Sequence, residues 1–254
     1  MGETKEVHHM TDSREAAASA RGVTKTYGFG ETAVTALNNV DVMFNAGEFS
    51  AIMGPSGSGK STLLHCMAGL DRVSAGQVFI GDVDLTMLTD KNLTQLRRDK
   101  IGFVFQAFNL VPTLNARENI TLPMDIAGRK PDGEWLSHIV EILKLGDRLS
   151  HKPSELSGGQ QQRVAAARAL ASRPEIIFAD EPSGNLDSKS GTQLLQFMRQ
   201  AVEDYGQTIV MVTHDPLAAA HADRVVFLED GHIAGDMPEP TTDRILDRIK
   251  TLEG

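Results

Sequence analysis

The stretch Ala51-Ile-Met-Gly-Pro-Ser-Gly-Ser-Gly-Lys-Ser-Thr-Leu63 decides the fold. An apolar run precedes a glycine-rich loop, and a segment with a helical apolar pattern follows the loop, so the expected order is strand, loop and helix. The spacing Gly54-x-x-x-x-Gly59-Lys60-Ser61 is that of a phosphate-binding loop. The alternative is an ordinary Gly/Ser turn, and the position between a strand and a helix argues against it.

The chemistry of such a loop follows from its residue types. Glycines let the backbone wrap closely, so that its N–H groups and the start of the next helix point at the phosphates. Lys60 supplies a positive charge to the β- and γ-phosphate oxygens, and Ser61 supplies a magnesium ligand. We expect the triphosphate to be held by Gly54, Pro55, Ser56, Gly57, Ser58, Gly59, Lys60, Ser61 and Thr62.

A second motif is Ile176-Ile-Phe-Ala-Asp-Glu-Pro182, an apolar strand that ends in two carboxylates. Asp180 is placed to hold magnesium through a water molecule, and Glu181 to polarise the water that attacks the γ-phosphate. Two acids after a strand are also typical of a solvated turn. Together with the loop, they indicate a site for nucleotide hydrolysis.

Composition limits the other possibilities. The 254 residues carry a net charge of −9, which argues against a protein that coats nucleic acid through its phosphates, and no nucleic-acid partner is expected. A single cysteine, Cys66, excludes an intramolecular disulfide framework. The apolar runs are far shorter than a membrane span, and no secretory signal is visible, so we expect a cytoplasmic chain whose membrane role goes through a partner.

Strands and helices alternate along the chain, which predicts a parallel α/β sheet covered by helices. Trp135–Leu143 has apolar residues at helical spacing, and Asp230-Gly231 predicts a hairpin turn. The predicted strands are 20–26, 34–44, 48–53, 77–80, 101–105, 175–179, 208–212 and 224–228. The predicted helical segments are 89–99, parts of 115–170, 187–204 and 241–252.

The third motif is narrower. Leu156-Ser-Gly-Gly-Gln160, followed by Gln161-Gln-Arg-Val, resembles the signature of the ABC ATPase family. A Ser-Gly-Gly turn that enters a helix offers free N–H groups and a hydroxyl to an anion, and the alternative is that Ser157 only caps the helix. Since the first loop already holds one triphosphate, a second anion site is most simply explained if it caps a γ-phosphate held by another subunit.

The resemblance implies roles for further residues. Gln106 resembles the glutamine that touches the metal or the water, Ser183-Gly-Asn-Leu-Asp187 resembles the D-loop, and His214 resembles the histidine that contacts the γ-phosphate. Tyr27 stands where the family stacks an aromatic ring on adenine, although Phe29 competes for this role and Tyr27 could be an ordinary strand-edge residue. The implied catalytic residues are Glu181, His214, Gln106 and Lys60, the magnesium ligands are Ser61, Gln106 and Asp180, and the residues given to the other subunit's ATP are Ser157, Gly158, Gly159, Gln160 and Asp187.

The resemblance covers about residues 20–235, and the segments around Phe103–Pro112 and Asp180–Ser188 look like the MacB/LolD/FtsE branch. Ser183 departs from the expected threonine but keeps the hydroxyl. The implied fold is a RecA-like P-loop NTPase core with an N-terminal antiparallel β region and an inserted helical subdomain at about 112–165. We expect a mobile extension at 1–19, the ATPase domain at 20–236 and a helical tail at 237–254.

The implied function is ATP hydrolysis by a homodimer that closes and opens to drive an integral membrane permease of the FtsX/MacB type, bound at a groove near Gln106–Pro112. The work done through that partner is export, extraction or mechanotransmission. The chain would then sit on the cytoplasmic face of the membrane through that partner. Alternatives are a cell-division regulatory ATPase of the FtsE type or a soluble ABC ATPase. For Cys66, Trp135, His65 and His138 we expect packing roles only.

Overall fold

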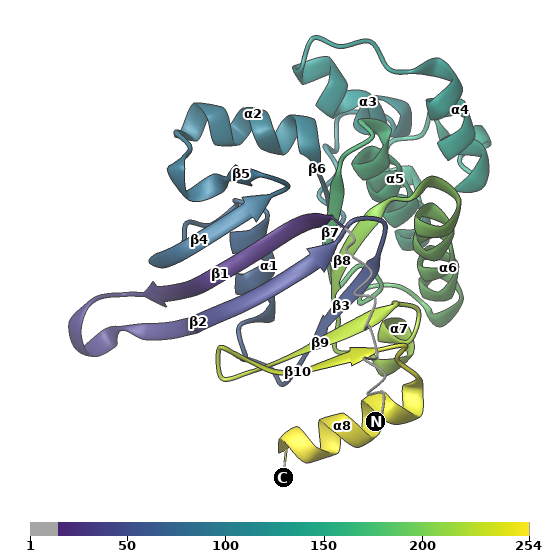
Figure 1. The fold of residues 1–254 in the computed structure, drawn as a ribbon. Helices are drawn as coiled ribbons and strands as arrows, with labels where there is room; N and C mark the ends of the chain where they lie inside the picture. The colour runs from purple at the N-terminus through teal and green to yellow at the C-terminus, as the bar shows by residue number, and fades with distance from the viewer. Residues whose placement is uncertain (1–14, 254) are drawn as a thin grey trace, which may run out of the picture.

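The computed structural model describes residues 15–253, in which two β-sheets enclose one helix and further helices cover the outside (Figure 1). The central sheet has the strand order β10-β9-β3-β8-β7-β6. Its neighbours pair in parallel, except that β10 pairs antiparallel with β9. The strands are β3 (Phe49–Met53), β6 (Ile101–Phe105), β7 (Ile176–Asp180), β8 (Thr208–Val212), β9 (Arg224–Glu229) and β10 (His232–Pro238).

The register of the central sheet brings four loops to one edge. Asp180 pairs with Val212 on β8 and with Phe105 on β6, and Ile52 on β3 also pairs with Val212. The carboxyl ends of β3, β8, β7 and β6 are therefore level. Ligands in open α/β sheets bind outside this edge, so the loops that follow these strands are the expected location of a site.

A second sheet is antiparallel, as the N-terminal β region was predicted to be, and has the order β2-β1-β4-β5. The hairpin of β1 and β2 projects from the body of the molecule (Figure 1). The side chains of Tyr27, Phe29 and Val34 near its tip are exposed. The strands are β1 (Ala16–Tyr27), β2 (Val34–Asn45), β4 (Ala75–Ile80) and β5 (Val83–Asp84).

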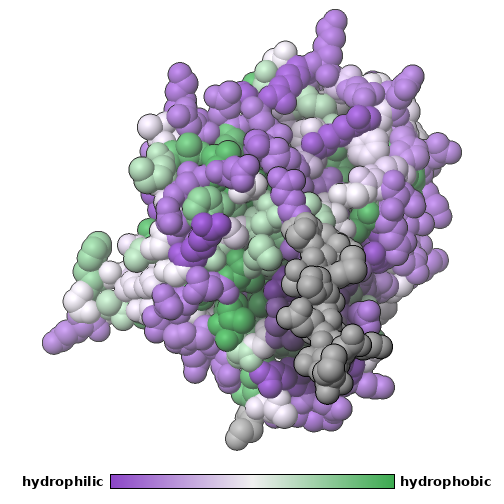
Figure 2. Space-filling model, viewed as in Figure 1, coloured by the Kyte–Doolittle hydropathy of each residue, from purple (hydrophilic) through white to green (hydrophobic). Residues whose placement is uncertain are grey.

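Helix α1 lies between the two sheets, and its buried Leu63, Leu64 and Met67 belong to a core shared with both. The other face of the central sheet packs against α5 and α6 in a second core. Hydrophilic residues dominate the helical part on the face that Figure 2 shows. The helices are α1 (Lys60–Met67), α2 (Asp90–Lys100), α3 (Ala116–Ile126), α4 (Gly133–Ile142), α5 (Gly158–Ala171), α6 (Ser188–Tyr205), α7 (Pro216–Ala219) and α8 (Thr242–Glu253).

Several predicted boundaries were wrong. Strand β1 begins at Ala16, so residues 16–19, expected in a mobile extension, pair with β2 and β4, and Ala18 is buried. Small residues suit this position because the strand is covered by α1. The expected end of the helical subdomain at about 165 falls inside α5, which ends at Ala171 as the helical stretch predicted to about 170 does. The expected tail from 237 begins inside β10. Residues 1–14 of the expected extension, with His8 and His9, lie outside the described residues.

The hairpin predicted at Asp230-Gly231 is confirmed. Both residues have positive φ, 45° and 77°, as a type I′ turn between β9 and β10 requires.

The two-residue strand β5 was not predicted, because two residues show no alternation. Cys66 packs in the core as expected, and burial raises the pKa of its thiol to about 12. Among the described helices, none combines the length and apolarity that a membrane span needs.

Candidate functional site

The glycine loop between β3 and α1 has a backbone that only glycine adopts easily. Gly54 and Gly59 have φ of 150° and 99°, and a Cβ atom on either would overlap a backbone carbonyl oxygen, of Leu228 and Ala36 respectively. The loop is thus pressed against the neighbouring backbone. In the described chain, no acceptor takes the N–H groups of Lys60, Ser61 and Thr62 at the start of α1. These groups are available to an anion in front of the helix.

Lys60 is buried and lies inside the loop. Its Nζ donates to the carbonyl oxygens of Gly54 at 2.9 Å and Pro55 at 2.7 Å. Burial lowers the pKa of the Lys60 ammonium, and the carboxylates of Glu181 and Asp180 oppose this shift. The two hydrogen bonds hold the Lys60 ammonium beside Gly54 and Pro55, in the loop that the sequence predicts to bind the β- and γ-phosphates.

Ser61 and Asp180 meet across the gap between α1 and β7. The Ser61 hydroxyl donates to Asp180 Oδ1 at 3.0 Å. A hydroxyl and a carboxylate are the oxygen ligands that Mg²⁺ prefers, and Mg²⁺ at phosphate sites needs only one or two carboxylates because the phosphates supply other oxygens. The pair fits a magnesium ion bound together with a triphosphate, and these ligands stay a prediction.

Glu181 and His214 also come together, from the ends of β7 and β8. His214 Nδ1 lies 2.8 Å from Glu181 Oε2, and the imidazole is largely exposed while the carboxylate is three-quarters buried. Glu181 has a φ of 46°, in the left-handed region that is unfavourable for a residue other than glycine. Its N–H donates to the Val212 carbonyl and its carbonyl accepts from Gly184, so both neighbouring segments hold this conformation. Such strain is typical of functional sites.

Gln106 follows β6 at the same edge and is exposed. The Gln106 side chain packs against Gly184, where a Cβ would lie 2.9 Å from Gln106 Nε2. The backbone carbonyl oxygen of Gln106 accepts a hydrogen bond from Asn185 Nδ2 at 3.0 Å. The predicted Q-loop and D-loop are thus in contact. Asp187 caps α6 by accepting from the N–H and hydroxyl of Ser190, and the hydrogen bond from that hydroxyl lowers the pKa of the Asp187 carboxyl.

The segment after Gln106 is hydrogen-bonded to α5 through Arg168. Phe108 and Asn109 have positive φ, 58° and 48°, and the Arg168 guanidinium donates to the carbonyl oxygens of both, at 3.1 and 2.6 Å. Each bond stabilises a left-handed residue. The region Gln106–Pro112, predicted to receive a membrane partner, is therefore tied to the signature helix.

Ser157 forms a capping box with Gln160 at the start of α5. The Ser157 hydroxyl accepts from the Gln160 N–H at 3.3 Å, and Gln160 Oε1 accepts from the Ser157 N–H at 2.8 Å. The capping alternative is thus real in this chain, and the exposed hydroxyl keeps a second lone pair for another donor. Within residues 15–253, no hydrogen bond or ion pair joins Ser157–Gln160 to the loop Gly54–Ser61. The structure does not bring these two predicted anion sites together in one chain.

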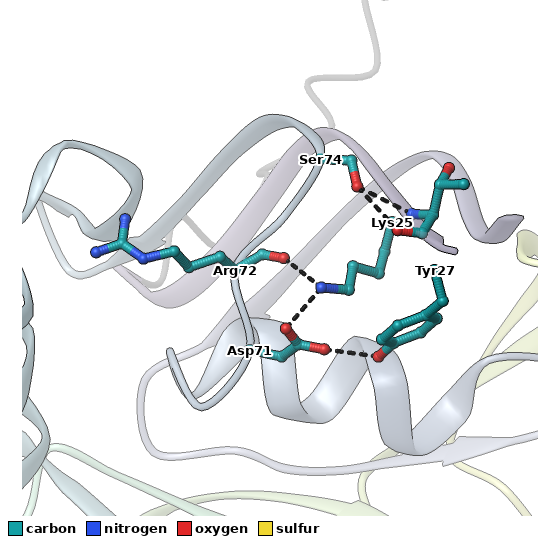
Figure 3. Close-up of polar contacts among 6 residues, drawn as sticks. Lys25, Tyr27, Asp71, Arg72 and Ser74 are labelled. Carbon is teal, nitrogen blue, oxygen red and sulfur yellow. Dashed lines mark hydrogen bonds and ion pairs between the residues drawn. The ribbon is translucent and has the colours of Figure 1, made fainter. Parts of the chain in front are cut away.

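Tyr27, at the end of β1, is fixed by a network of polar contacts that no local sequence pattern predicts (Figure 3). Its hydroxyl donates to Asp71 Oδ2 at 2.6 Å, and Lys25 Nζ donates to Asp71 Oδ1 at 2.6 Å and to the Arg72 carbonyl at 2.7 Å. The Lys25 ammonium also lies 4.6 Å from the centre of the Tyr27 ring. Since Asp71 follows α1, the network ties the ring to the phosphate-loop helix. Phe29 is 92% exposed, which makes Tyr27 the better-positioned of the two candidates for stacking.

The Tyr27 network gives a pH prediction. Burial, with the hydrogen bond to Asp71, raises the pKa of the Tyr27 phenol to about 12 from its usual 10. The folded state therefore binds the phenolic proton more tightly than the unfolded state, and the free energy of unfolding should fall as pH rises from about 10 to 12. In a Tyr205→Phe variant, ultraviolet absorbance would report Tyr27 alone and should show half-ionisation near pH 12. A midpoint at pH 10 would show that the network does not hold the ring.

Two parts of the site were missed at the sequence level. His65, predicted to pack in the core, instead points at the site, with Nε2 3.5 Å from Asp180 Oδ2, because it lies one turn after Ser61 on the same face of α1. His138 is exposed on α4 and contacts Tyr205. A cavity of about 170 Å³ beside the loop is lined by Pro55, Ser56 and His214 together with Ile249 and Leu252 of the C-terminal helix α8.

Comparison with known proteins gives consistent matches. A family model described as ABC transporter matches residues 37–184, more than half of the chain. An ABC transporter ATP-binding protein of Methanocaldococcus jannaschii, MJ0796, is 48% identical over 219 residues, which are 84% of this chain and 93% of that protein. The macrolide export ATP-binding/permease protein MacB of Marinobacter nauticus is 46% identical over 216 residues, which are 84% of this chain but 33% of that protein.

A solved dimeric structure of the MJ0796 cassette, in a post-hydrolysis state bound to ADP and Pi, matches with a TM-score of 0.80 and 44% sequence identity. The match covers 88% of this chain and 99% of that chain. It confirms the predicted fold, a P-loop core with an N-terminal β region and an inserted helical subdomain.

Proposed function

The chain belongs to the ABC transporter family and is an ATP-binding subunit that hydrolyses ATP, and we propose that two copies of it close head to tail around two ATP molecules. One observation carries the proposal. The loop Gly54–Ser61, Glu181 and His214 gather at one sheet edge, whereas Ser157–Gln160 offers helix N–H groups with no bond to that loop in the described chain. A head-to-tail pair would give each triphosphate both sets of donors.

In each copy, the phosphate loop and Lys60 would bind the triphosphate of ATP, and the Tyr27 ring would stack on adenine. Ser61 and Asp180, with Gln106, would hold Mg²⁺, which when bound offsets the negative charge of the phosphates. Asp180 would act through a water molecule. The hydrogen bond from the Ser61 hydroxyl to Asp180 Oδ1, 3.0 Å long, supports this pairing, because it brings the two oxygens close enough to serve one metal ion.

Glu181 would act as the general base, taking a proton from the water that attacks the γ-phosphate. His214 would contact the γ-phosphate while its Nδ1 holds the Glu181 carboxylate, which fixes the direction of the basic oxygen. Gln106 would orient the water or the metal. The partner copy would add Ser157, Gly158, Gly159 and Gln160 at the γ-phosphate, with Asp187 nearby, so that closure of the dimer completes the site.

Hydrolysis would remove the charge that both copies share, and the dimer would open. We propose that this cycle drives an integral membrane permease of the FtsX/MacB type, seated near Gln106–Pro112, and holds the chain at the cytoplasmic face of the membrane. The bonds from Arg168 to Phe108 and Asn109 support this location, because they tie the docking segment to the helix that would contact the other copy's ATP. The export named for MacB supports an outward direction of transport.

The shared site predicts how the ATPase rate depends on protein concentration. At saturating ATP and below the dissociation constant of the dimer, the rate should rise with about the square of the protein concentration, since only dimers turn over. The measurement is specific activity over a dilution series, with the fraction of dimer followed by light scattering. Specific activity that stays constant down to concentrations where only monomers are present would refute the proposal.

A further inference from the structure

Gln162 is a fully buried amide in the second turn of α5, at 0% exposure. Its Nε2 donates to the carbonyl oxygen of Pro182 at 2.6 Å and to that of Phe105 at 3.3 Å. Its Oε1 is buried and has no hydrogen-bond partner within residues 15–253. Since both neighbours are carbonyl oxygens, only the amide NH₂ group suits this place, and the orientation of the side chain is determined.

The two acceptors of Gln162 lie next to catalytic residues. Phe105 is the last residue of β6 and precedes Gln106, and Pro182 follows Glu181. One amide therefore bridges the ends of two neighbouring strands, at the points where the chain leaves the sheet to form the site. An apolar side chain would fill the same volume but would leave the Pro182 carbonyl without this donor, so the amide serves the link between the two strand ends and not the filling of space.

The same helix begins at the capping box of Ser157 and Gln160, two residues before Gln162. A helix moves as a stiff body over one turn, because its backbone hydrogen bonds and its close packing resist local deformation. A displacement of the N-terminus of α5 is thus passed by Gln162 to Phe105 and Pro182. We propose that Gln162 is a positioning residue that couples the two ATP sites of the dimer. When the ATP held by the partner contacts the N-terminus of α5 in one copy, Gln162 of that copy positions Glu181 and Gln106 at the copy's own ATP site.

This inference rests on the proposed function, because it requires that Ser157–Gln160 serves the other copy's nucleotide. The neighbouring Gln161 provides a matched control. Its Nε2 donates to the Leu156 carbonyl at 3.1 Å, within the same segment, and the structure gives its side chain no bond to β6 or to residues 181–182 among the described residues. The two positions have the same residue type on the same helix and differ in what they bridge.

The test compares Gln162→Met with Gln161→Met. Methionine keeps the length of the side chain and loses the donor. For the wild type we expect a Hill coefficient for ATP near 2, the number of sites in a dimer, and for Gln162→Met a value near 1 with kcat lowered about tenfold. The ATP affinity of the monomer should not change, because Gln162 lies outside the phosphate loop. Gln161→Met should keep the wild-type Hill coefficient and kcat.

A thermal unfolding curve of each variant accompanies the kinetics, and Gln162→Leu replaces Gln162→Met if the latter does not fold. A merely structural role would lower the melting temperature and leave the Hill coefficient at the wild-type value, which would overturn the proposal. A wild-type Hill coefficient of 1 would overturn it as well. If specific activity depends on protein concentration while Gln162→Met keeps the wild-type Hill coefficient, the coupling by Gln162 is refuted and the ATP site shared by two copies is supported. If specific activity does not depend on concentration, the shared site itself fails.

Discussion

Replacing Glu181 with glutamine should stop turnover while ATP stays bound, and the protein should then accumulate as a dimer. Glutamine keeps the size of the side chain and its oxygen toward His214 Nδ1, which lies 2.8 Å from Oε2 in the wild type. It cannot take a proton from the attacking water. Loss of a general base typically lowers the rate by about 10² to 10⁴-fold, so kcat should fall by about three orders of magnitude. Phosphate release measures the rate, and size-exclusion chromatography with and without ATP measures the dimer.

A matched control for this variant lies on α6. Glu203 is exposed and pairs with Arg199 one helical turn away, far along the chain from the site loops. Glu203→Gln removes the same charge, and because exposed pairs contribute little to stability, we expect wild-type turnover and no ATP-dependent accumulation of dimer. Turnover of Glu181→Gln at the wild-type rate would show that another group activates the water. Loss of ATP binding would show that Glu181 holds the nucleotide.

Local sequence patterns predicted most of the elements and the composition of the site. The glycine loop, the two carboxylates at the end of β7 and the Asp230-Gly231 turn are short segments, in which the residue types alone restrict the backbone. The family resemblance then placed Gln106 and His214 at strand ends, and the parallel register brings both to the edge that carries Glu181.

The features that the sequence did not predict depend on contacts between distant segments. The strand order puts β8 between β3 and β7, and this order brings His214 to Glu181. Nothing local in the sequence marks Asp71 as the partner of Tyr27, or Ile249 as a neighbour of the phosphate loop. For His65 only a packing role was expected, but its position one turn after Ser61 directs it toward Asp180.

Replacing Ser157 with arginine should separate ATP binding from ATP hydrolysis. Ser157 is exposed, and no hydrogen bond or ion pair of the described residues links it to the phosphate loop of its own chain. The variant should therefore bind ATP with wild-type affinity. Its bulky side chain would fill the surface that meets the partner's γ-phosphate, and the loss of such a preorganised donor set lowers turnover by about 10² to 10³-fold. Combined with Glu181→Gln, it should abolish the ATP-dependent dimer.

Ser154→Arg is the control for the Ser157 variant, since Ser154 is exposed three residues earlier, outside the capping box. It should bind ATP, hydrolyse it and dimerise as the wild type does. Circular dichroism checks α5, because loss of the Ser157 cap alone destabilises a helix by about 1 kcal/mol, too little to unfold a domain of this size. Normal hydrolysis by Ser157→Arg would exclude the signature from the reaction. Loss of ATP binding by the variant monomer would place Ser157 in its own chain's nucleotide site, and the head-to-tail arrangement would then have no basis.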